Sequence, residues 1–142
     1  MPLIVGNVLI HVVGLNLIGL CVLGDYVGIL RRRSDFVDFV LIVGITGLLT
    51  ISLHALEGAV WGAAYLLLGA LNNKKAAMLY SLGAMTTYGH ANIHLSPHWE
   101  LLGAMEALQG MLLFGLTTAF LFAIFQEVSP LGSGIRRKAP TG

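Results

Sequence analysis

The stretch Thr86-Thr87-Tyr88-Gly89-His90-Ala91-Asn92 is a short polar run in an otherwise apolar sequence. The segment 74–85 before it is long enough for about three helical turns, and a long apolar segment, 99–125, follows Pro97. A short helix, irregular backbone and then a spanning helix is the layout of a re-entrant loop. Irregular backbone is tolerated in a membrane only where protein buries it or where it lines a water-filled cavity. The stretch is therefore predicted to face water or ions inside an assembly.

The composition predicts an integral membrane protein. The chain has 142 residues, of which 56% are hydrophobic and 11% charged, whereas a soluble domain carries about 25% charged residues. The sequence has no nucleophile–base arrangement, phosphate-binding glycine loop or basic patch with interleaved aromatics, so we expect neither an enzyme nor a nucleic-acid partner. The single cysteine, Cys21, excludes an intramolecular disulfide and is interpreted as a small buried or lipid-facing residue.

The polar run resembles the selectivity filter of the potassium-channel superfamily, Thr-Thr-Val-Gly-Tyr-Gly-Asp, which also follows a pore helix. Aligned without gaps, the first, second and fourth residues match. The valine, the tyrosine, the second glycine and the aspartate are replaced by Tyr88, His90, Ala91 and Asn92. The flanking sequences resemble small bacterial members of the two-helix ion-channel family more closely, and the resemblance covers 36–126. The segments that carry it are 54–57, 61–65, 95–107 and 112–122.

This resemblance implies an all-α membrane protein of the bacterial inner membrane. It would have three transmembrane helices, a re-entrant pore helix and a filter-like loop, assembled as a homotetramer around a central axis. Monovalent cations, potassium or sodium, would permeate passively, and no cofactor would be required. Three segments are expected: a peripheral helix with an Arg-rich cytoplasmic loop in 1–34, a pore domain in 35–128 and a flexible basic tail in 129–142. The pore domain would consist of an outer helix 36–71, a pore helix 74–85, a filter-like loop 86–97 and an inner helix 98–127.

Loop charges predict the orientation of this multi-pass chain. Cytoplasmic loops carry an excess of lysine and arginine. The basic segments 31–33 and 136–138 lie on the same side of a three-span arrangement. We therefore expect the N-terminus outside and the C-terminus in the cytoplasm, with the filter-like run entering from outside. The first span, about 3–23, is then an addition to the two-helix core.

The altered filter predicts altered selectivity. Potassium filters use backbone carbonyls to replace the hydration shell of the ion, and alternate residues need left-handed backbone angles that favour glycine. Gly89 supplies one such position, but Ala91 replaces the other. Thr87 can form an inner ring, Tyr88 is bulkier than valine, and His90 can form a ring of imidazoles at the mouth. The run could form a wider cation path, a plug, or a metal or proton site.

Histidines form two further candidate sites. His90, His94 and His98 are expected in the outer vestibule, either as exposed loop residues or as a metal-binding or pH-sensing ring. His54 and Glu57 share one helix face deep in an apolar segment, with His11 as a possible third partner. Ionisable groups in a membrane need a partner or a cavity. Two interpretations remain open for this group: a buried hydrogen bond that joins two helices, and a site for a transition metal or proton relay.

The last span carries candidate support and gating residues. The resemblance implies that Glu106 braces the pore helix from behind, through Thr86 or Tyr80. Gly110 and Gly115 suit either close helix packing or a gating bend. The candidates for the lining of an inner cavity are Thr117, Thr118 and Phe122, although an aromatic such as Phe122 could equally contact lipid.

Two other functions compete with the channel. A histidine-rich membrane bundle could bind a metal or haem and transfer electrons, since the chain has five histidines. A non-conducting relative could keep the channel fold as a regulatory or assembly subunit.

Overall fold

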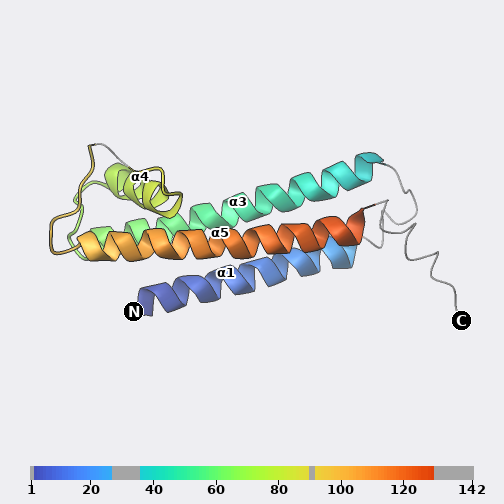
Figure 1. Cartoon of the computed structure of the whole chain (residues 1–142), viewed down its shortest axis with the longest axis horizontal. Helices are drawn as coiled ribbons and strands as arrows, with labels where there is room; N and C mark the ends of the chain where they lie inside the picture. The colour runs from blue at the N-terminus through green and yellow to red at the C-terminus, as the bar shows by residue number, and fades with distance from the viewer. Residues whose placement is uncertain (1, 27–35, 90–91, 130–142) are drawn as a thin grey trace, which may run out of the picture.

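The computed structural model describes residues 2–26, 36–89 and 92–129, and this part of the chain is helical, without a β-sheet (Figure 1). A π-helix continues the first α-helix. The elements are α1 (Pro2–Leu20), η1 (Cys21–Tyr26), α3 (Phe36–Leu67), α4 (Lys74–Met85) and α5 (Glu100–Val128). The basic segments 31–33 and 136–138, from which the orientation was predicted, lie outside the described residues.

Three helices are long and apolar enough to cross a membrane: Pro2–Gly24, Phe36–Leu67 and Glu100–Val128. They lie side by side and alternate in direction (Figure 1). The predicted all-α architecture with three spans is confirmed, and it indicates a membrane protein.

Both polar and apolar side chains are buried between the long helices, and many large apolar side chains are exposed on the outside. Leu9 is 59% exposed and Leu48 is 65% exposed. This pattern suits a lipid environment, because lipid is as apolar as leucine, whereas polar groups in a membrane need partners inside the protein. The buried polar residues of the three long helices are Asn7, His11, Thr46, Thr50, His54, Glu57, Glu106, Gln109 and Thr117.

Helix α3 ends at Leu67, four residues before the predicted boundary at 71. Gly69 has a φ of 68°, a left-handed conformation that glycine adopts readily after a helix. The amides of Ala70 and Leu71 then both donate to the Tyr65 carbonyl, at 2.9 and 3.3 Å. Helix α5 begins at Glu100 rather than 98, because 97–99 forms a turn, and it ends at Val128 rather than 127.

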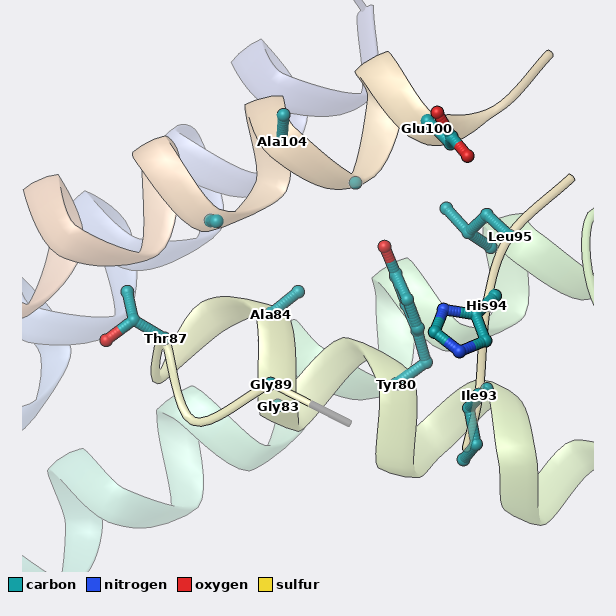
Figure 2. A pocket seen from close by; sticks show the side chains of 12 residues that line it. Tyr80, Gly83, Ala84, Thr87, Gly89, Ile93, His94, Leu95, Glu100 and Ala104 are labelled. Carbon is teal, nitrogen blue, oxygen red and sulfur yellow. The ribbon is translucent and has the colours of Figure 1, made fainter. Parts of the chain in front are cut away.

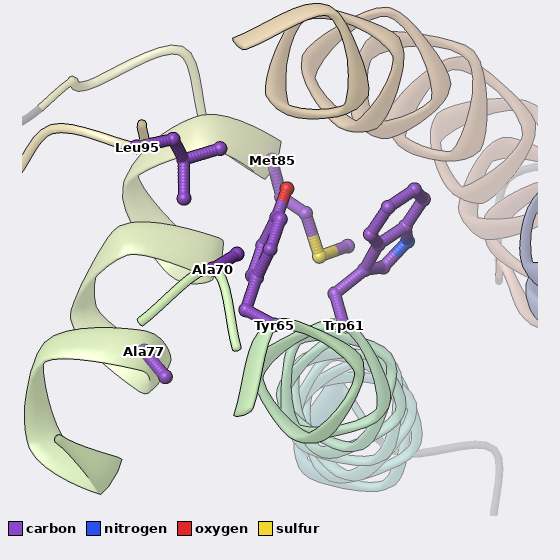
Figure 3. Close-up of a cluster of buried hydrophobic side chains, with 6 residues drawn as sticks. All are labelled: Trp61, Tyr65, Ala70, Ala77, Met85 and Leu95. Atoms are coloured by element: carbon purple, nitrogen blue, oxygen red, sulfur yellow. The ribbon is translucent and has the colours of Figure 1, made fainter. Parts of the chain in front are cut away.

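The short helix α4 has the predicted bounds, 74–85. It begins where the Asn73 side chain accepts a hydrogen bond from the Ala76 amide at 3.1 Å, as an N-cap residue does. The helix packs beside the C-terminal end of α3 and the N-terminal part of α5 (Figure 1). Its apolar contacts form the cluster in Figure 3, whose buried members are Trp61, Tyr65, Ala70, Ala77, Met85 and Leu95.

Candidate functional site

The chain leaves α4 through a tight turn made by the first part of the polar run. The Thr86 amide donates to the Leu82 carbonyl at 3.1 Å, and the Thr87 amide donates to the Ala84 carbonyl at 3.0 Å. The Gly89 amide reaches back to the Gly83 carbonyl at 3.1 Å. These bonds pair carbonyls that the end of a helix would otherwise leave unsatisfied.

Left-handed backbone recurs at every second residue of this turn. Gly89 has a φ of 72°, as predicted, and Thr87 has a φ of 57°. Tyr88 between them does not have a positive φ. The angle at Thr87 was not predicted, because this conformation costs a residue with a Cβ about 1–2 kcal/mol. Such strain persists only where the surroundings impose it.

The C-terminal end of α4 lies deep along α5. A Cβ atom on Gly110 would collide with the Met85 backbone, so the two main chains are in close contact. Gly110 lies ten residues after the start of α5, which is about 15 Å along the helix. This is about half of the roughly 30 Å hydrocarbon core of a bilayer.

A cavity of about 430 Å³ opens beside the turn, between α4 and the first part of α5. Figure 2 shows Tyr80, Ala84 and His94 on one side and Ala104 on the other. Thr87 and Gly89 also line it. Tyr88, which lies between them, is 86% exposed. Thr86 and Asn92 are exposed as well, whereas His90 and Ala91 lie outside the described residues.

Glu106 braces α4 from behind through two hydroxyls that were not among the predicted partners. Its carboxylate accepts hydrogen bonds from the Ser81 hydroxyl of α4 and the Tyr65 hydroxyl of α3, both at 2.5 Å. Thr86 instead donates to the Leu82 carbonyl of its own helix at 2.6 Å. All three members of this bracket, Tyr65, Ser81 and Glu106, are fully buried.

Sequence reasoning missed Tyr65 and Ser81 as partners of Glu106. The available signal was that a carboxylate in an apolar segment needs donors, and both hydroxyls occur in such segments. Tyr80, the other predicted support, packs edge-on against Tyr65 with ring centroids 5.3 Å apart. Burial raises the pKa of Tyr80, and the charges of Glu106 and Glu100 raise it further. Its phenol therefore stays protonated.

The gating candidates of α5 divide between two faces. Thr117 is buried and contacts histidines, so its predicted place in a cavity lining is wrong. Thr118 and Phe122 are exposed. Gly110 serves close packing, whereas a Cβ on Gly115 would meet nothing within 4 Å. Neither glycine interrupts the helix.

A second polar cluster joins the three long helices. His11 Nδ1 lies 2.8 Å from Glu57 Oε1, and His54 Nδ1 lies 3.0 Å from Glu57 Oε2. On the opposite side of the two rings, Thr117 Oγ1 lies 3.0 Å from His54 Nε2 and 3.4 Å from His11 Nε2. The structure thus brings His11 to the predicted His54–Glu57 pair and adds Thr117.

His94 and His98 do not join this cluster, and His90 lies outside the described residues. His94 lines the cavity beside the turn, and His98 is exposed with its ring edge-on to Trp99. Within the described residues, His11, His54 and Glu57 form the one group of three whose ligand atoms lie close enough to hold a metal ion.

Comparisons with protein families, with curated proteins and with solved structures give no match to this chain. Its sites are therefore interpreted from their own geometry.

Proposed function

We propose that this protein is the subunit of a pore-loop cation channel in the bacterial inner membrane. Four copies would surround a central path, with the N-terminus outside and the C-terminus in the cytoplasm. The observation that carries the proposal is the exposed, irregular backbone of 86–89, which follows the end of α4 beside Gly110, about 15 Å along α5.

The depth of this turn argues for an assembly. Helix α4 has 12 residues and is about 18 Å long, too short to cross a bilayer. The C-terminal end of α4 lies beside Gly110 of α5. The polar, non-helical backbone that follows it would therefore lie within the bilayer. Such backbone is tolerated only when it is buried in protein or lines a water-filled cavity. Because 86–89 is exposed in the single chain, neighbouring copies and water would have to surround it.

One face of α5 supports the same arrangement. Residues three, four or seven apart share a helix face, and an exposed row on α5 continues from the cavity beside the turn. Its members are Ala104, Ala107, Met111, Gly115, Thr118 and Phe122, of which Ala107 is half-buried. In an assembly that places 86–89 on the axis, this row would line the path below it. Phe122 could then close the path by dewetting.

The proposed path differs from a potassium filter. Thr87 and Gly89 supply alternating left-handed positions at its inner end. Tyr88 replaces valine between them, and Ala91 replaces the next glycine. We propose a cation path without strict potassium selectivity, lined by the threonine and tyrosine hydroxyls and by carbonyls.

Ion flux into liposomes tests this function with a matched pair of variants. Gly89 and Gly69 both have a positive φ and open space for a Cβ, so Gly89→Ala and Gly69→Ala should cost similar stability, about 1–2 kcal/mol each. The wild type should pass potassium and sodium. Gly89→Ala should change the rate or ion ranking, and Gly69→Ala should not.

Two results would contradict the proposal. Equal changes in flux from both variants would show that the ion path does not pass through 86–89. A folded, oligomeric wild type that passes no ion would favour the non-conducting subunit instead.

A further inference from the structure

We propose that His11, His54 and Glu57 form a binding site for a divalent first-row transition metal, with zinc as the reference ion. The site lies inside the bundle, where α1, α3 and α5 meet, and is separate from 86–89. It does not rest on the proposed channel function.

The three residues have the chemistry and placement of a metal centre. Two imidazoles and one carboxylate are a common ligand set for zinc when three protein groups bind it. One ligand atom from each residue lies within 4.8 Å of the other two. Ligand atoms around tetrahedral zinc are about 3.3 Å apart at the usual bond lengths. The separations of 2.8 Å from His11 Nδ1 to Glu57 Oε1 and of 3.0 Å from His54 Nδ1 to Glu57 Oε2 are each a few tenths of an ångström shorter than this.

The hydrogen atoms of the cluster are too few to satisfy all of its acceptors while both imidazoles are neutral, so one additional cation, either a proton or a metal ion, is needed. If both neutral imidazoles donate Nδ1–H to Glu57, both Nε2 atoms must accept hydrogen bonds. Among the described residues, the hydroxyl between them is that of Thr117, which has one hydrogen and can serve one of the two. The longer contact, 3.4 Å to His11 Nε2, is the one left unsatisfied. His11 is 0% exposed, so an unpaired nitrogen there is costly.

A metal ion between the rings and Glu57 resolves this shortage. Each imidazole would ligate through Nδ1 and carry its hydrogen on Nε2. The Thr117 oxygen has two lone pairs and could accept from both Nε2–H groups. An outer hydrogen bond of this kind orients metal-binding histidines and fixes their tautomer. His54 is further held by Phe114, whose ring stacks on it at a centroid distance of 4.3 Å.

The ligand atoms also restrict what the site can bind. Nitrogen ligands suit zinc, copper, nickel and iron, whereas magnesium and calcium prefer oxygen. The two imidazole centroids are 5.3 Å apart, and both rings contact Glu57 on one edge and Thr117 on the other. A haem therefore does not fit between them. The side chain of His54 is 11% exposed, so the site lies close to the surface of the bundle.

Metal titration of the purified, chelator-treated protein tests the site. Zinc should bind with a stoichiometry of about one ion per chain, and cobalt(II) in its place should give the visible bands of a low-coordinate centre. His54→Gln and Glu57→Gln should each weaken zinc binding about 100-fold or more. The double variant His94→Gln/His98→Gln, which alters exposed histidines, should bind zinc like the wild type.

The wild-type measurements keep the test decisive if a cluster variant misfolds. The proposal is overturned if the wild type binds no stoichiometric zinc and shows no cobalt bands, and the cluster would then hold a proton in place of a metal. It is also overturned if the His94/His98 variant, rather than the cluster variants, abolishes binding.

Discussion

Two buried carboxylates join the helices of this bundle, and they differ in the groups with which they form hydrogen bonds. Glu106 is bonded to two hydroxyls, those of Tyr65 and Ser81, whereas Glu57 is bonded to two imidazoles, those of His11 and His54. Both carboxylates are 0% exposed. Hydroxyls are poor zinc ligands, so we interpret Glu106 as a structural support for α4. Imidazoles give Glu57 the ligand set of a metal site.

The two carboxylates also fasten different parts of the chain. Glu106 joins α3, α4 and α5, and so fixes the short helix that carries the exposed turn. The Glu57 cluster joins α1 to α3 and α5. The first carboxylate holds the short helix that precedes the proposed ion path, and the second holds α1 against α3 and α5.

The largest effect is expected from Glu106→Ala. It leaves the Tyr65 hydroxyl buried without its acceptor, at about 1–3 kcal/mol, whereas the Ser81 hydroxyl can still donate to the Gly58 carbonyl at 2.8 Å. The free energy of unfolding in detergent should fall by about 1–3 kcal/mol for the unpaired hydroxyl, and the cavity left by the removed side chain adds to this loss. Glu100→Ala, which alters an exposed carboxylate at the start of the same helix, should change it little. Equal losses from the two variants would show that Glu106 is not a bracket.

A smaller effect is expected from Gly110→Ala. The new Cβ would collide with the Met85 backbone, and overpacking of this kind costs about 1–3 kcal/mol. Thermal unfolding should detect the loss, and proteolysis within 86–99 should become faster as α4 shifts. Gly115→Ala is the matched control on the same helix, since nothing lies within 4 Å of its Cβ. A harmless Gly110→Ala would contradict the close approach of α4 to α5.

The smallest change in stability is expected from Thr117→Val. Loss of one hydrogen bond between membrane helices costs about 0.6 kcal/mol on average. The same variant should lower zinc affinity about 10–100-fold, because it removes the group that orients both imidazoles. Thr118→Val, which alters an exposed neighbour that bonds only to the Phe114 carbonyl at 2.8 Å among the described contacts, should leave zinc affinity unchanged. Equal affinities in the two variants would argue against a role for Thr117.

Local signals predicted much of the fold, whereas contacts between helices were harder to predict. The polar break before Lys74 and the polar run after Met85 defined α4 correctly, because capping and loss of apolar character are local. The end of α3 was placed too late, since an apolar segment continues past Gly69. Thr117 was assigned to the wrong face of α5, because the face that a helix buries depends on its neighbours. The sequence indicated that Glu106 needs hydrogen-bond donors. It did not indicate that Ser81, rather than Thr86, would be the donor from α4.

Thiol cross-linking at residue 88 tests most directly whether copies of the chain meet at the exposed turn. In a Cys21→Ser background, Tyr88→Cys should give covalent dimers with a short bifunctional thiol reagent, because four copies would place this residue around one axis. Leu9→Cys, on the exposed outer face of α1, should stay monomeric under the same conditions. Absence of Tyr88→Cys dimers in an assembled protein, or equal cross-linking at both positions, would contradict a central path lined by 86–89.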